Sequence, residues 1–254
     1  MQLATWNVNS LTVRLPQVLD WLAANPVDAL VLQETKCTDD KFPHEAIEAA
    51  GYKVAFFGQK TYNGVALLSR NEATDVVKNI PGFEDDMARV IAGTVDGVRV
   101  IGAYFPNGQA PDSDKFVYKM RWLEALQNWV REELKQHPKL VLMGDFNITV
   151  DDRDVWDPVA LKDTIHCTVE ERDHFQALID LGTHDAFRLF EQAEKSYSWW
   201  DYREFAFRRN RGLRIDHILV SDALKHQVQS CVIDKAPRKN ERPSDHTPVV
   251  VTLA

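Results

Sequence analysis

Short apolar runs recur along the chain, and most of them are rich in β-branched residues. Such runs, bounded by polar or turn-forming residues, are typical of strands that are buried in a sheet. The pattern predicts strands over residues 3–6, 29–32, 65–69, 98–104, 140–143, 215–220 and 249–253.

Other segments repeat their apolar residues at the spacing of one helix face, which predicts helices over residues 14–24, 115–137 and 175–181. The second segment ends just before Pro138, a residue that cannot continue a helix, and Gly182 closes the third.

Strands and helices do not alternate strictly. Residues 54–69 and 90–104 are predicted to form hairpins, the second through the Asp96-Gly97 turn. Hairpins among longer connections favour an α/β sandwich with mixed sheets over a doubly wound parallel sheet. Because no Pro-, Gly- or Ser-rich linker interrupts the chain, residues 1–254 are expected to form a single domain.

The composition fits a globular protein in a reducing compartment. The chain has 254 residues, of which 44% are hydrophobic, and its three cysteines form no CxxC or zinc-binding spacing. A chain of this length needs no disulfide to stabilise its core. No segment is long and apolar enough to cross a membrane, and the first residues lack a basic leader. We therefore expect a soluble, cytoplasmic protein without a membrane partner.

The net charge of −8 argues against a nucleic-acid partner, but the charges are unevenly distributed. Residues 195–214 hold six basic and two acidic residues, a local excess of +4, and aromatic residues alternate with the arginines. For any single residue, solvated surface charge is the simpler explanation. The combination nevertheless indicates DNA, since guanidinium groups bind phosphates and aromatic rings stack on bases or wedge between them.

Polar side chains that bind ions or move protons stand at the ends of the predicted strands. For any one of them a turn or strand cap is an equally good explanation, because Asn and Asp favour such positions. The repeated placement favours one shared site. Its candidate members are Asn7, Glu34, Tyr104, Asp145, Asn147, Asp216, Asp245 and His246.

This set suits metal-assisted hydrolysis of a phosphodiester. Mg²⁺ prefers oxygen ligands and needs only one or two carboxylates, and Glu34 is the best candidate ligand, with Asn7 beside it. His246 can donate to a phosphate oxygen or move a proton, and Asp216 can orient its ring.

The remaining members suit the attacking water and the phosphate. Asp145, backed by Asn147, can hold the water as base or orienter, and Tyr104 can donate to the phosphate. No serine or cysteine nucleophile is needed for such a reaction.

The motifs that carry these residues resemble those of the exonuclease III family of AP endonucleases, within the wider endonuclease/exonuclease/phosphatase superfamily. The resemblance runs nearly from end to end, in order along the chain. It rests on TWNVNS (5–10), LQETK (32–36), GVALLS (64–69), YFPNG (104–108), MGDFN (143–147), SWWDYR (198–203), NRGLRID (210–216) and PSDH (243–246).

The resemblance implies a four-layer α/β sandwich like that of pancreatic DNase, in which two packed mixed β-sheets are flanked by helices. It implies a nuclease, dependent on Mg²⁺ or Mn²⁺, that hydrolyses DNA phosphodiester bonds at abasic sites or blocked 3′ ends. Such an enzyme would combine 3′–5′ exonuclease and 3′-phosphatase or 3′-phosphodiesterase activities. The expected partner of a monomeric enzyme is double-stranded DNA with an abasic site, a nick or a 3′ end.

The same resemblance distributes roles. Glu34 and Asn7 match metal residues, and Asp245 matches a carboxylate near the metal or the histidine. Tyr104, Asp145, Asn147, Asp216 and His246 match the catalytic set. Residues implied to contact DNA are Arg89, Asn107, Lys115, Trp199, Trp200 and Arg211. For the two tryptophans core packing is an equally good explanation.

His166 departs from the family, which carries a small residue at the matching position. An imidazole there would narrow the pocket that receives a flipped-out sugar. We therefore predict that His166 hinders incision at internal abasic sites and leaves trimming of blocked 3′ ends possible. The competing explanation is a surface histidine on an acidic loop.

Two other functions stay open at this point. A phosphatase of the same fold that acts on a small-molecule or lipid phosphoester would not need the aromatic and basic stretch of residues 199–214. A non-catalytic DNA-binding protein would not need the full carboxylate and histidine set. The sequence neither ranks the abasic-endonuclease, exonuclease and 3′-phosphatase activities nor decides between one metal ion and two.

Overall fold

The computed structural model describes residues 1–254 and contains two six-stranded sheets. The first sheet has the strand order β13-β14-β1-β2-β4-β3, and it brings both ends of the chain together. Only β1 and β2 pair in parallel, so the sheet is mixed. Its strands are β1 (Gln2–Asn7), β2 (Ala29–Gln33), β3 (Lys53–Phe57), β4 (Val65–Ser69), β13 (Val228–Ile233) and β14 (Val249–Leu253).

The second sheet comes from the middle of the chain and has the order β5-β6-β7-β8-β12-β9. It is also mixed, because β7 and β8 are parallel and its other pairs antiparallel. Its strands are β5 (Thr74–Lys78), β6 (Val90–Val95), β7 (Val98–Tyr104), β8 (Leu140–Asp145), β9 (Thr183–Asp185) and β12 (Asp216–Ser221). A separate two-stranded hairpin joins β10 (Trp199–Trp200) to β11 (Gly212–Leu213).

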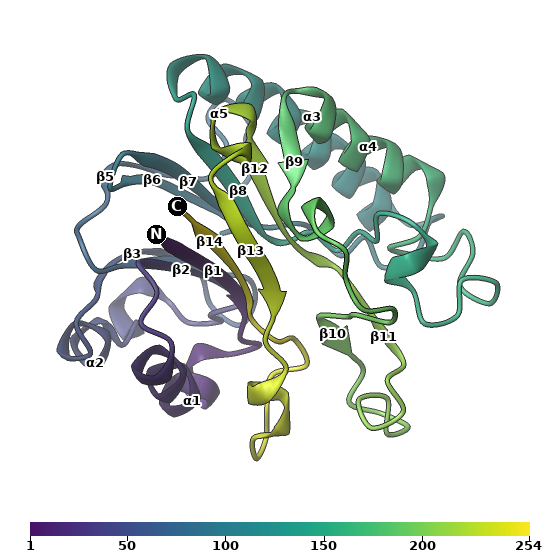
Figure 1. Cartoon of the computed structure of the whole chain (residues 1–254), viewed down its shortest axis with the longest axis horizontal. Coiled ribbons are helices and arrows are strands. Elements are labelled where there is room, and N and C mark those ends of the chain that lie inside the picture. The colour runs from purple at the N-terminus through teal and green to yellow at the C-terminus, as the bar shows by residue number, and fades with distance from the viewer.

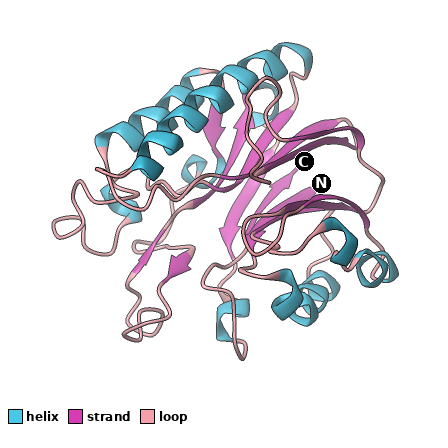
Figure 2. Ribbon diagram, turned by 180° about the vertical axis from the view of Figure 1, so that it is seen from behind, coloured by secondary structure: helices cyan, strands magenta, loops and turns pink.

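The two sheets pack face to face, and helices cover the outer face of each (Figure 1, Figure 2). The first sheet is covered by α1 (Leu11–Ala24) and α2 (His44–Ala49), and the second by α3 (Asp114–Gln136) and α4 (Val169–Asp180). A short helix, α5 (Asp222–Lys225), follows β12. The predicted four-layer α/β sandwich is therefore confirmed. None of the helices combines the length and apolar character needed to cross a bilayer.

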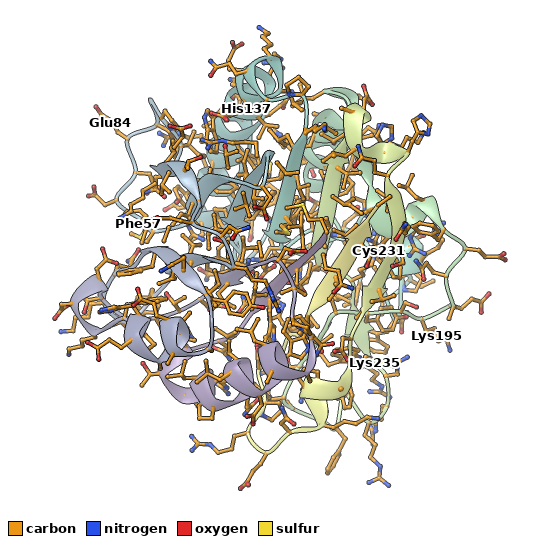
Figure 3. The ribbon with its side chains drawn as sticks, turned by 60° about the vertical axis from the view of Figure 1, so that its left-hand side comes forward. Phe57, Glu84, His137, Lys195, Cys231 and Lys235 are labelled. Carbon is orange, nitrogen blue, oxygen red and sulfur yellow. The ribbon has the colours of Figure 1, made fainter.

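The core explains why the strands are continuous apolar runs. On β2, Ala29 and Val31 face the other sheet, whereas Leu30 and Leu32 face the helices. A strand that is covered on both faces is apolar at successive positions, so its sequence shows no alternation of apolar and polar residues. Side chains fill the space between the layers in Figure 3, where Cys231 marks β13 of the first sheet.

One close contact between the two sheets occurs at a glycine. A Cβ atom at Gly102 on β7 would lie 2.8 Å from Cγ1 of Val31 on β2. Any side chain at position 102 would therefore push the two sheets apart.

Capping side chains determine where the helices begin. Ser113 begins α3 by accepting a hydrogen bond from the Phe116 amide. The helix predicted over residues 175–181 in fact begins at Val169, because Thr168 and Glu171 form a reciprocal capping box.

Candidate active site

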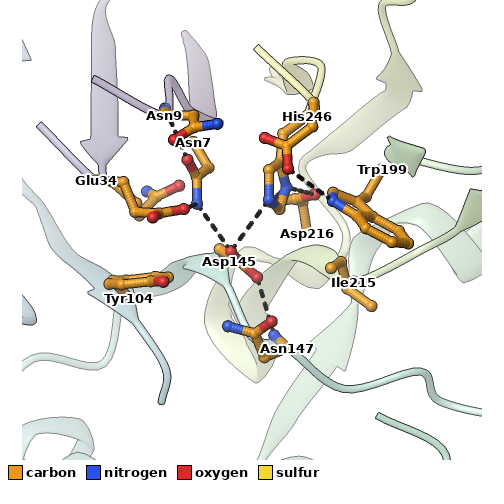
Figure 4. A network of polar contacts seen from close by, with 12 residues as sticks. Asn7, Asn9, Glu34, Tyr104, Asp145, Asn147, Trp199, Ile215, Asp216 and His246 are labelled. Carbon is orange, nitrogen blue, oxygen red and sulfur yellow. Dashed lines mark hydrogen bonds and ion pairs between the residues drawn. The ribbon is translucent and has the colours of Figure 1, made fainter. Parts of the chain in front are cut away.

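The predicted site residues meet at one edge of the sandwich, where strands of both sheets end (Figure 4). The parallel strands β1 and β2 deliver Asn7 and Glu34 to this edge. The parallel strands β7 and β8 place Tyr104 level with Asp145, and the antiparallel β12 starts opposite it at Asp216. The loop before β14 adds Asp245 and His246. The strand register thus gathers side chains that are far apart in the sequence.

Asn7 links the carboxylates of the two sheets. Its Nδ2 donates to Glu34 Oε2 at 2.6 Å and to Asp145 Oδ2 at 2.9 Å, and its Oδ1 accepts from the Asn9 amide. Asn7 and Asp145 are buried, whereas Glu34 keeps some exposure to solvent. The pKa of Asp145 is raised, first by burial and then by the charges of Asp216 and Glu34, although His246 opposes the shift.

His246 lies between two carboxylates. Its Nδ1 is 2.8 Å from Asp216 Oδ2, and its Nε2 is 3.5 Å from Asp145 Oδ2. An ionised carboxylate only accepts, so Nδ1 carries a proton. Burial acts to lower the pKa of His246, but Asp216 and Asp145 outweigh it and raise the pKa well above its usual value. This arrangement favours an imidazolium that can donate through Nε2.

Asn147 and Tyr104 flank Asp145. The backbone amide of Asn147 donates to Asp145 Oδ1 at 3.0 Å, and its side-chain Nδ2 donates to the Phe105 carbonyl at 2.9 Å. Burial and the nearby Glu34 and Asp145 charges raise the pKa of Tyr104 well above its usual value. The phenol therefore stays protonated and can act as a hydrogen-bond donor.

Asp245 has one oxygen that no protein group satisfies. Its Oδ2 accepts from Trp199 Nε1 at 3.0 Å, whereas Oδ1 is buried without a partner. An unsatisfied buried carboxylate oxygen is costly and indicates that something else binds there.

The donor set fits a hard divalent cation. A carboxylate oxygen of Glu34, one of Asp145 and a ring nitrogen of His246 lie within 4.8 Å of one another, and as an imidazolium His246 leaves the cation to the carboxylates. With Asp216 and the unsatisfied Asp245, four carboxylates converge against one histidine. Such an excess of negative oxygen ligands is the environment that Mg²⁺ and Mn²⁺ prefer.

Four of the residues predicted to contact DNA are polar or basic. Asn107 and Lys115 are exposed to solvent, as such contacts require. The guanidinium of Arg89 lies 5.1 Å from the Tyr104 ring centre, and that of Arg211 lies 5.1 Å from the Trp156 ring centre. Stacking therefore orients both arginines.

The structure corrects the expectation for Trp200. Its side chain has no exposed surface, its Nε1 donates to Asn210 Oδ1 at 3.0 Å, and its ring packs edge-on against Phe207. It belongs to the core of the hairpin and cannot contact DNA in this conformation. Trp199 is only half-buried and lies beside Asp245, so it alone of the pair faces the site.

His166 is not a surface residue. It is 9% exposed and lines a cavity of about 620 Å³ together with Trp199 and Arg211. Its Nε2 lies 3.2 Å from Asn107 Nδ2. Burial, with Lys119 and His246 nearby, lowers the pKa of His166 to about 3, so the imidazole is neutral.

Two positioning residues escaped the sequence-based prediction. Ser198 is fully buried, and its Oγ accepts from the backbone amides of Ile215 and Asp216, both at 3.1 Å. Lys36 Nζ lies 3.7 Å from Glu34 Oε1 and 2.7 Å from Asn9 Oδ1. Only their place inside the motifs 198–203 and 32–36 could have drawn attention to them.

Comparisons with known proteins show the family of the chain. The profile of the Endonuclease/Exonuclease/phosphatase family matches residues 4–246. Exodeoxyribonuclease III of Haemophilus influenzae is 36% identical over 98% of both chains. Among solved structures, the 3′ phosphatase NExo from Neisseria, bound to a product DNA hairpin, is 50% identical with a TM-score of 0.99, covering 100% of this chain and 99% of its own.

A further solved structure, an AP endonuclease from Archaeoglobus fulgidus, is 36% identical with a TM-score of 0.96, and covers 100% of this chain and 99% of its own. The family match, these identities and the shared fold extend over the same residues that build the site. The chain therefore belongs to the endonuclease/exonuclease/phosphatase family and, within it, to the exonuclease III group.

Proposed function

We propose that the protein is a DNA repair nuclease that depends on Mg²⁺ or Mn²⁺ and hydrolyses phosphoester bonds at the 3′ ends of double-stranded DNA. The observation that carries this proposal is the convergence of Glu34, Asp145 and His246, whose side-chain polar atoms lie within 4.8 Å of one another. The relatives described above, which are named as an exodeoxyribonuclease and a 3′ phosphatase, support DNA as the substrate.

In this proposal the residues divide the reaction between them. Glu34 would hold the cation, with Asn7 and Asp245 beside it. The cation, when bound, neutralises charge that develops on the phosphate. Asp145, whose pKa is raised, accepts the proton of the attacking water.

Two side chains donate hydrogen bonds to the phosphate. His246, held by Asp216, donates through Nε2 to a phosphate oxygen, and the Tyr104 phenol donates to another. Asn147 orients Asp145 through its backbone amide. The basic and aromatic hairpin of residues 199–213 lies beside the site, where it can bind the DNA backbone and groove. A small-molecule phosphatase would have no use for this hairpin.

We further propose that removal of 3′-blocking groups dominates over incision at internal abasic sites. His166 supports this bias, because its imidazole occupies part of the cavity beside Trp199 in which a flipped sugar would lie. We also propose that the protein acts as a monomer in the cytoplasm, where its three free cysteines would stay reduced.

One assay separates these statements. The protein is incubated with duplexes that carry a 3′-phosphate nick, a recessed 3′ end or an internal abasic site, with and without Mg²⁺. We expect cation-dependent turnover that is fastest on the 3′-phosphate. No turnover on any duplex would refute the nuclease assignment.

The bias is tested with His166→Ser, and His226→Ser, at an exposed position, serves as the matched control. We expect His166→Ser to raise abasic incision at least about tenfold, with little change on the 3′-phosphate nick. Unchanged abasic incision would show that His166 does not limit this activity.

A further inference from the structure

A fully buried ion pair, Lys119 of α3 with Glu171 of α4, lies beneath the site and takes no part in the reaction described above. Both side chains are 0% exposed, and the ammonium donates to Glu171 Oε2. Removing two charges from water is costly, and two apolar side chains would join the helices equally well. The pair therefore needs an explanation other than helix packing.

The explanation lies in the other groups that Lys119 contacts. Its Nζ also donates to the backbone carbonyls of Asn147, at 2.7 Å, and Asn107, at 3.2 Å. An ammonium has three N–H donors, and all three are used. One donor goes to the partner helix, and the other two fix loops that carry predicted site residues.

Glu171 fixes the third loop. Its Oε2 accepts from the His166 amide at 3.1 Å, while Oε1 accepts from the amide and hydroxyl of Thr168. His166 has a φ of 74°, a left-handed conformation that costs energy for any residue with a side chain. On the other side of this residue, the backbone amide of Thr149 donates to the His166 carbonyl at 2.9 Å. The carboxylate thus holds a strained backbone in place.

The side chains of the three fixed residues meet above the ion pair. Asn107 Nδ2 lies 3.2 Å from His166 Nε2 and 3.4 Å from Asn147 Oδ1. The Gln109 amide donates to Asn107 Oδ1, so Asn107 must present its NH₂ group to the histidine. His166 Nε2 therefore accepts, and its proton resides on Nδ1. The backbone amide of Asn147 connects this group to the active site, because it donates to Asp145 Oδ1.

The packing around Lys119 leaves little room for adjustment. A Cβ atom at Gly108 would lie 2.9 Å from Lys119 Cδ and 3.0 Å from Ile165 Cδ1. The loop of Asn107 thus lies directly on the lysine stem and against the residue before His166.

We propose that Lys119 and Glu171 form a positioning pair that fixes Asn107, Asn147 and His166 relative to Asp145, and so sets both the rate and the preference for 3′-blocked ends. The pair touches neither substrate nor metal and acts through these three residues. This inference rests on the proposed function for its substrate, but the geometry it describes belongs to the chain itself.

The test replaces the pair by apolar side chains of similar volume, Lys119→Met with Glu171→Met. Exchanging a buried ion pair for such residues is often neutral for stability. Here it also leaves the carbonyls of Asn107 and Asn147 and the amides of His166 and Thr168 without their partners, so the double variant should melt below the wild type. The matched control is Arg99→Met with Glu133→Met, an ion pair that joins α3 to β7, at the end of the strand away from Tyr104.

We expect kcat on a 3′-phosphate nick to fall at least about tenfold in the double variant, because small misplacements of reacting groups cost this much or more. KM should change less, and the ratio of 3′-phosphate removal to abasic incision should fall. The control variant should keep both kcat and this ratio.

A second measurement does not depend on activity. Amide hydrogen exchange in peptides covering residues 105–110, 146–150 and 164–168 should accelerate in the double variant and stay unchanged in the control. Unchanged exchange in these three loops, together with a wild-type kcat and substrate ratio, would overturn the proposal.

Two further outcomes are also decisive. If the double variant fails to fold, kcat and hydrogen exchange are measured in Glu171→Gln instead. The Gln side chain has one acceptor oxygen, so it cannot accept the hydrogen bonds that both carboxylate oxygens of Glu171 accept. Wild-type kcat and exchange in Glu171→Gln would likewise overturn the positioning role. If the wild type cleaves none of the duplexes, the proposed function fails, whereas the exchange comparison still decides whether the pair fixes the loops.

Discussion

Replacing Asp216 with Asn removes the negative charge that lies closest to the His246 imidazole, with almost no change in volume. In the wild type, Nδ1 of His246 lies 2.8 Å and 3.1 Å from the two carboxylate oxygens. Both groups are buried, so water cannot screen their attraction. The substitution therefore isolates the electrostatic support of the imidazolium.

The magnitude follows from Coulomb's law. Two unit charges about 4 Å apart, at an effective dielectric constant of about 20, attract by about 4 kcal/mol. Losing this attraction lowers the pKa of His246. If the imidazolium donates to the phosphate, its loss should lower kcat by about 10²- to 10⁴-fold near neutral pH.

The sign of the pH effect is fixed by the direction of the shift. Because the wild-type pKa of His246 is raised, the imidazolium persists above neutral pH. In Asp216→Asn it loses its proton at lower pH, so the basic limb of the pH–rate profile should move to lower pH. The raised pKa also stabilises the fold below the unfolded pKa of about 6.5, and this contribution is lost as pH rises through the folded value.

The assay is kcat against pH on a 3′-phosphate nick, with thermal unfolding recorded over the same pH range. Asp222→Asn is the matched control, because Asp222 forms an exposed pair with His184 at 2.6 Å, far more accessible to solvent than the buried one. A basic limb at the same pH in Asp216→Asn and wild type would refute the assignment of His246 as the donor.

Three further predictions concern the carboxylates. Asp145→Asn should abolish turnover but leave DNA affinity within a few-fold in a gel-shift titration, and substantial remaining turnover would contradict its role at the water. Glu34→Gln should raise the Mg²⁺ concentration for half-maximal rate by at least about tenfold, whereas an unchanged metal titration would exclude Glu34 as a ligand. Arg214→Met should lower the free energy of unfolding in urea by about 3–5 kcal/mol, because it leaves the largely buried Asp185 without its ion-pair partner and the buried Asp154 with Arg188 alone, and a loss below about 1 kcal/mol would contradict this account.

The strands that the sequence predicts are those covered on both faces. All seven predicted runs coincide with strands of the two sheets, because burial on both sides leaves an unbroken apolar signal. The missed strands β5, β9 and β13 are edge strands, and the short hairpin strands β10 and β11 were missed as well. The residues of β5 and β13 are largely exposed or half-exposed, so pairing with a neighbour, rather than composition, makes them strands.

The candidate site was accessible to sequence reasoning for a different reason. Residues at the ends of adjacent strands are brought together by register, so the order of strands and polar residues along the chain is enough to group Glu34, Asp145 and Asp216. Whether an aromatic residue packs in the core or contacts DNA depends on which residues cover it, and a sequence motif does not show this. The motif therefore predicted a DNA contact for Trp200, which is buried. The partners Lys119 and Glu171 stand 52 positions apart on two helices, and no periodicity links them.

The close approach of Gly102 to Val31 has a consequence for the dimensions of the active site. Gly102 lies two residues before Tyr104, the strand partner of Asp145, and Val31 lies three residues before Glu34, so the contact joins the strands that position both carboxylates. The gap between Glu34 and Asp145 therefore depends on the spacing of the two sheets. A side chain at position 102 would widen that gap and change the space available to a cation held at Glu34 as proposed. The dimensions of the active site thus depend on interior packing as well as on the side chains that line it.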